Sequence, residues 1–107
     1  MTATSTTAGT AVVENLTTGK KVSHSFSGQS RALQELNAEW IVEDFSSGNS
    51  LVPFANFGTV TFTSNTATTS SGSVGPQGAT IIDIKQNNKV LTQSSVSGSN
   101  VIVKYIG

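Results

Sequence analysis

Residues 58–64 read GTVTFTS, and this stretch decides the fold class. In an extended chain Val60 and Phe62 fall on one side, while Thr59, Thr61 and Thr63 fall on the other. Strict alternation of apolar and polar side chains is typical of a strand that buries one face. We therefore expect a half-buried β-strand here.

Strand-like segments of this kind make up most of the chain. In 20–27, Val22, His24 and Phe26 alternate with serines, and Gly19 suits a turn that joins this segment to its predecessor. Asn87 and Asn88 are placed for a second hairpin turn, since asparagine tolerates a positive φ. The expected strands are 10–16, 20–27, 39–45, 58–64, 79–86, 89–96 and 100–106. Short strands separated by glycine-rich turns predict an all-β, antiparallel sandwich.

The remaining segments are expected to be connections. Residues 30–36 are too short for a stable helix, so we predict a loop with at most a helical turn. Residues 46–56 and 63–78 are expected to be loops. A chain of 107 residues is one domain in size, so we predict a single domain over 1–107.

The composition excludes several kinds of site. Six basic and six acidic residues give no net charge, which argues against nucleic-acid or membrane partners. The chain has no cysteine and one histidine, His24, so we predict neither a metal site nor a cofactor. His24 shares its side with Val22 and Phe26 and is expected to be a packed or edge residue. Ser and Thr account for 31 residues, a composition typical of secreted proteins.

The acidic residues gather in NAEWIVEDF, residues 37–45. In a strand, Trp40, Val42 and Asp44 would point to one side, and Glu39, Glu43 and their alternating neighbours to the other. From the residues alone, acids on a strand usually solvate an exposed face. Proton chemistry is the alternative.

This motif, together with VPFANFGTVTF (52–62), VENLTTGKKVSHSFS (13–27) and SVSGSNVIVKY (95–105), resembles the glutamic peptidases, also called eqolisins. The motifs occur in the family's order along essentially the whole chain, and they resemble the C-terminal half of such an enzyme. The resemblance implies a lectin-like (concanavalin A-like) β-sandwich, here a half or truncated version. It also implies a secreted acid endopeptidase acting on polypeptide substrates.

The family's chemistry implies a Glu and a Gln that together activate one water molecule. By position the catalytic Glu falls on Glu43, and Phe45 beside it would line a substrate subsite. An ionised Glu43 would take a proton from the attacking water and return it to the leaving amine. The Gln would donate an N–H to the developing oxyanion. A free glutamate titrates near pH ~4.3, which suits acid-active chemistry.

The sequence departs from the family in one decisive respect: the partner Gln belongs to the half that is not matched. The glutamines of this chain stand in other sequence contexts and are expected to be ordinary polar residues. They are Gln29, Gln34, Gln77, Gln86 and Gln93. Whether the chain is an enzyme by itself is therefore open.

Three readings remain. The chain is the Glu-bearing half of a peptidase, inactive until a complementary N-terminal chain joins it. Alternatively, it is a half-sandwich that completes itself by oligomerisation, for example as a homodimer, because unpaired sheet edges favour association. In the third, it is a non-catalytic binding module.

Overall fold

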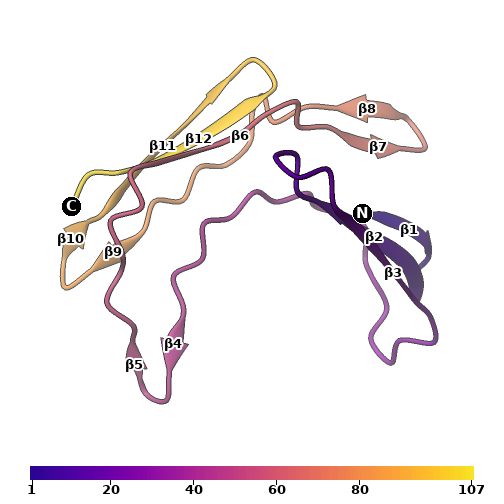
Figure 1. Ribbon diagram of the computed structural model, residues 1–107, viewed down its shortest axis with the longest axis horizontal. Coiled ribbons are helices and arrows are strands. Elements are labelled where there is room, and N and C mark those ends of the chain that lie inside the picture. The colour runs from indigo at the N-terminus through magenta and orange to yellow at the C-terminus, as the bar shows by residue number, and fades with distance from the viewer. The chain divides into compact units, whose positions relative to one another are not determined.

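The computed structural model describes residues 1–107 and is built from twelve strands (Figure 1). The strands are β1 (Thr2–Ser5), β2 (Ala8–Glu14), β3 (Lys21–Phe26), β4 (Ser46–Ser47), β5 (Ser50–Leu51), β6 (Thr59–Phe62), β7 (Ala67–Thr69), β8 (Gly72–Val74), β9 (Lys85–Gln86), β10 (Lys89–Val90), β11 (Thr92–Ser97) and β12 (Asn100–Tyr105). Every paired set of strands is antiparallel, which confirms the predicted all-β, antiparallel class. No helix is long and apolar enough to cross a membrane.

The chain divides into two compact units, an N-terminal unit (Met1–Asn37) and a C-terminal unit (Ala38–Gly107). The N-terminal unit holds the sheet β1–β2–β3. The C-terminal unit holds the sheet β11–β12–β6 and three short hairpins. That all 107 residues form one domain stays a prediction.

In the N-terminal unit, β2 and β3 form the predicted hairpin (Figure 1). Gly19 closes its turn with φ of 72°, a conformation that glycine adopts without strain. Val22 pairs with Val13, and Phe26 lies opposite Gly9. A side chain at Gly9 would come within 2.9 Å of the Phe26 ring, so the bare backbone allows this ring to pack closely.

The central sheet of the C-terminal unit contains the core. β12 lies between β11 and β6, and Val103 pairs with Val60 while Val101 pairs with Phe62. Val101 and Val103 are the only buried hydrophobic residues, with 8% and 7% of their surface exposed. Thr59 and its alternating neighbours face the other way and are exposed. The alternation in 58–64 therefore predicted both the strand and its buried face.

An aromatic cluster joins the segment after β5 to the end of β12. The rings of Phe54 and Phe57 meet edge to face, with centroids 5.7 Å apart, and Tyr105 lies 6.3 and 6.2 Å from them. The Tyr105 amide donates to the carbonyl of Gly58 at 2.8 Å. These contacts anchor residues 54–58 beside β6.

Three predictions about strands were wrong. The expected strand 89–96 is divided at Leu91 into β10, which pairs with β9, and β11, which pairs with β12. Residues 39–45 form no strand, because their backbone joins no ladder and makes a single hydrogen bond, from the Val52 amide to the Phe45 carbonyl. Of residues 79–86, only β9 is a strand. The Ile84 amide donates to the Thr92 hydroxyl at 2.8 Å instead of a ladder carbonyl, so a side-chain hydrogen bond replaces strand pairing there.

The expected connections behave differently from one another. Residues 30–36 contain no helix, as predicted. The segments 46–56 and 63–78, expected to be loops, each contain a hairpin, β4–β5 and β7–β8. Gly48 has a positive φ in the turn of the first hairpin, and Gly72 has one at the first residue of β8. The sequence did not reveal these hairpins, because their strands have only two or three residues.

Candidate active site

The candidate site lies on residues 38–45, here named the Glu43 segment, which runs without strand pairing toward β4 (Figure 1). Exposure alternates along it with period two. Trp40, Val42 and Asp44 are half-buried, whereas the residues between them are exposed. The backbone is therefore extended, and the sidedness inferred from the sequence is present although the strand is not.

Three hydrogen bonds fix the C-terminal end of this segment. The Gln86 Nε2 donates to Asp44 Oδ1 at 2.9 Å and to the carbonyl of Val52 at 3.1 Å. The Val52 amide donates to the carbonyl of Phe45, also at 3.1 Å. Asp44, Phe45, Val52 and Gln86 thus form one connected network.

Glu43 and Phe45 lie on the exposed side of the segment. Glu43 is exposed, and 56% of Phe45 is exposed. Ile41, on the same side, is 58% exposed. This side combines the Glu43 carboxylate and, four residues before it, that of Glu39 with two large apolar side chains, a combination suited to binding a peptide next to an acid–base group. The catalytic role of Glu43 and the substrate-binding role of Phe45 stay predictions.

Gln86 does not carry a free donor group. Both hydrogen bonds of its amide nitrogen go to groups of the chain itself, so its N–H groups are engaged. Gln29, in the N-terminal unit, donates to the carbonyl of Ser27 at 3.3 Å. The structure brings no glutamine of this chain into a recorded hydrogen bond with Glu43.

Sequence reasoning missed the contribution of Asp44. The signal was present, because the alternation placed this acid on the same side as Trp40 and Val42. A carboxylate on a half-buried face needs a hydrogen-bond donor. The donor comes from Gln86, 42 positions further along the chain, a distance that no local pattern spans.

An open hollow of about 510 Å³ adjoins this network. It is lined by Asn49, Leu51, Pro53, Gln86 and Asn87. Gln86 thus both lines the hollow and donates to the Asp44 carboxylate. Glu43 is not among the lining residues.

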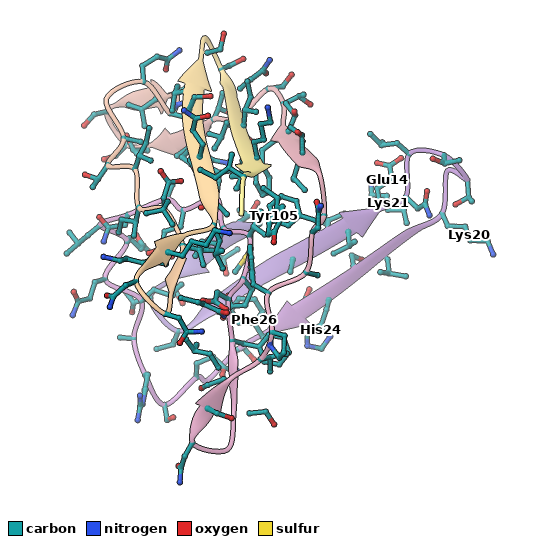
Figure 2. All side chains as sticks on the ribbon, turned by 90° about the vertical axis from the view of Figure 1, so that its left-hand side faces the viewer. Glu14, Lys20, Lys21, His24, Phe26 and Tyr105 are labelled. Carbon is teal, nitrogen blue, oxygen red and sulfur yellow. The ribbon has the colours of Figure 1, made fainter.

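Outside this region, three charged residues of the N-terminal unit lie close together on one hairpin. Glu14, Lys20 and Lys21 lie at its turn end, and His24 and Phe26 lie further along β3 (Figure 2). His24 is exposed and pairs in register with Ala11, so it is an edge residue and not a packed one. No group of three or more His, Cys, Asp or Glu side chains has a metal-binding arrangement.

Comparison with known families gives one consistent result. The model of the Peptidase A4 family matches residues 1–105. Aspergillopepsin-2 of Aspergillus niger is 58% identical over 97% of the chain, and scytalidopepsin B of Scytalidium lignicola is 46% identical over 99%. The chain spans 37% and 44% of these relatives, less than half of their length.

Comparison with solved structures gives the same family as comparison with these relatives. Aspergilloglutamic peptidase from Aspergillus niger superimposes with a TM-score of 0.89 at 58% identity, over 97% of this chain and 62% of that one. A member of the eqolisin family in complex with the tripeptide Ala-Ile-His gives a TM-score of 0.90 at 46% identity, over 97% and 56%. The resemblance read from the motifs is confirmed, and so is the expected fold class, the β-sandwich of the glutamic peptidases.

Proposed function

Because this chain belongs to the Peptidase A4 family, we propose that it is the Glu-bearing part of a secreted acid endopeptidase that cleaves polypeptides. The observation that carries the proposal is the placement of Glu43. The segment NAEWIVEDF holds this carboxylate on an exposed side while its neighbour Asp44 is fixed on the other. The likeness to two peptidases over nearly the whole chain supports the same reaction class.

In the proposed reaction Glu43 acts as general base and then as general acid. Its carboxylate removes a proton from a water molecule as the water oxygen attacks the scissile carbonyl carbon. The C–N bond then breaks, and Glu43 returns the proton to the departing amine. Phe45 and Ile41, exposed on the same side, offer apolar surface to substrate side chains.

The oxyanion requires a separate donor. Gln86 is engaged with Asp44 and Val52, so we assign the partner Gln to a complementary segment outside these 107 residues. Exposed apolar side chains support the existence of such a segment, since large apolar surface favours a binding partner. The most exposed of these are Met1 (92%), Leu16 (86%), Ile82 (85%) and Leu36 (76%).

The same exposed side chains favour a second candidate, a self-associating scaffold without catalysis. In this alternative a second copy of the chain covers the apolar surface, and Glu43 only solvates the exposed side of its segment. The two candidates differ in what binds the chain and in whether Glu43 matters.

The test combines the chain with the portion of the A. niger aspergilloglutamic peptidase that it does not match. Digestion of an unfolded protein is followed from acid to neutral pH. We expect cleavage at acid pH by the mixture and not by either part alone. Glu43→Gln should lower kcat at least ~100-fold, because general acid–base catalysis contributes at least that much.

Glu39→Gln is the matched control, because Glu39 is an exposed acid on the same side of the same segment. It should retain cleavage. If Glu39→Gln and Glu43→Gln lower kcat equally, Glu43 has no special catalytic role and is an ordinary surface charge. A stable mixed complex that cleaves nothing, or a homodimer that excludes the complementary segment, would favour the scaffold.

A further inference from the structure

Gln86 occupies a special place in the C-terminal unit. It is the last residue of β9 (Figure 1), it is half-buried, and its side chain donates a hydrogen bond to Asp44 in the Glu43 segment. Asn87 and Asn88 follow with φ of 50° and 62°, and they turn the chain directly into β10. A two-residue turn of this kind fixes the register of its hairpin, and with it the position of Gln86.

A second set of contacts holds β9 from the opposite end. The Leu91 amide donates to the carbonyl of Ile84 at 2.8 Å, and the Ile84 amide donates to Thr92. The Thr92 hydroxyl in turn donates to Asp83 at 3.1 Å, and Ser94 donates to the same carboxylate oxygen at 2.7 Å. The residues just before β9, which carries Gln86, are therefore tied by hydrogen bonds to β11 of the β11–β12–β6 sheet.

The Glu43 segment lacks such a support of its own. Its recorded hydrogen bonds are the one from Gln86 to Asp44 and the one from the Val52 amide to Phe45. Gln86 also donates to the Val52 carbonyl, so one amide group connects the Glu43 segment with residue 52. In an extended chain, fixing Asp44 on one side fixes Glu43 and Phe45 on the other.

We propose that Gln86 is a positioning residue that sets the direction of Glu43 through Asp44 and Val52. The inference rests on the proposed peptidase function. An amide suits the task in acid, because its two N–H groups do not titrate there.

The first readout is amide hydrogen exchange by NMR in the intact chain. Gln86→Met keeps the length of the side chain and removes both donors. We expect the Val52 amide to exchange about tenfold faster, as for the loss of one ordinary hydrogen bond, while the Val103 amide in the core is unchanged. Gln93→Met, an exposed glutamine of β11, is the matched control and should change neither amide.

A conservative variant separates positioning from general stability. Asp44→Asn retains an oxygen that accepts from Gln86, so Val52 should keep its protection, whereas Asp44→Ala should lose it. Unchanged exchange at Val52 in Gln86→Met would overturn the inference. Equal acceleration at Val52 and Val103 would also overturn it, since that pattern reports global destabilisation.

The second readout is kinetic and uses the cleaving mixture described above. We expect Gln86→Met to lower kcat about tenfold with KM changed less than twofold, because a misdirected base impairs the chemical step. A loss confined to KM would overturn the inference. Glu43→Gln could leave cleavage intact while Gln86→Met still accelerates hydrogen exchange of the Val52 amide. In that case the catalytic role of Glu43 is wrong, and the role of Gln86 in holding the Glu43 segment is retained.

Discussion

The β11–β12–β6 sheet and the Glu43 segment carry the same sequence pattern and have different structures. In the sheet, alternating side chains coincide with a complete antiparallel ladder from Thr92↔Tyr105 to Ser97↔Asn100. In the Glu43 segment, alternation persists in the exposure of the side chains although the backbone belongs to no sheet. Alternation in the sequence thus indicates which side a residue faces. Whether the segment pairs into a sheet depends on a second segment, which the local sequence does not identify.

This difference has an energetic counterpart. The sheet contains the buried valines of β12, and burial of these apolar side chains stabilises it. The Glu43 segment is held by side-chain hydrogen bonds at one end. A segment with few buried contacts opens at lower free energy than a core strand, which is common where a substrate must enter.

The largest effect on stability is expected from Val103→Ala. Val103 is 7% exposed, and removing two methyl groups from the core should lower the free energy of unfolding by about 2 kcal/mol. Chemical denaturation measures it. Val74→Ala, at a site that is 56% exposed, is the control and should cost little. Equal losses in both variants would mean that β12 is not the core.

The second largest effect is expected from Thr92→Val, which should lower the free energy of unfolding by about 1.5 kcal/mol. Thr92 is 1% exposed, and the change removes the acceptor for the Ile84 amide and a donor to Asp83 while preserving the volume. Thr59→Val, on the exposed side of β6, is the matched control. Thr92→Ser keeps the hydroxyl and should recover part of the loss. A neutral Thr92→Val would show that this network does not support β9.

The sequence predicted the features that local chemistry determines. Alternation identified β6 and β3, Gly19 and the Asn87-Asn88 pair identified two turns, and all of these are present. The motif around Glu43 identified the family. The hairpins β4–β5 and β7–β8 were missed, because their strands have only two or three residues and hence no period to detect.

What the sequence could not supply is long-range pairing. Residues 39–45 have the composition of a strand, yet strand formation requires a partner within hydrogen-bonding distance. The contact of Gln86 with Asp44 and Val52 joins positions 42 and 34 residues apart. Nothing in the residues beside Gln86 distinguishes it from the other glutamines, so its placement became visible only in the fold.

Asn88→Val tests whether the turn after β9 holds Gln86 in place, and its expected effect on stability is smaller than that of Thr92→Val. Asn88 has φ of 62°, which a β-branched residue adopts only with strain, so we expect a loss of about 1 kcal/mol. Asn88→Gly should be nearly neutral, because glycine adopts the same conformation freely. Denaturation gives the stability, and exchange at Val52 shows whether the strain reaches the Glu43 segment. Equal stability of the two variants would contradict the assignment of this turn.

The smallest effect is expected from Ile41→Thr, and it sharpens the comparison most directly. Ile41 is 58% exposed beside Glu43, so the isolated chain should change by less than about 0.5 kcal/mol. Val42→Thr, one residue further on the half-buried side, should cost about 1 kcal/mol because a hydroxyl replaces a packed methyl group. Denaturation of both variants at several protein concentrations is the measurement. If Ile41→Thr lowers the free energy of unfolding as much as Val42→Thr, and more so at higher protein concentration, a second copy of the chain covers this side. If the effect of Ile41→Thr does not depend on concentration, this side is open to substrate.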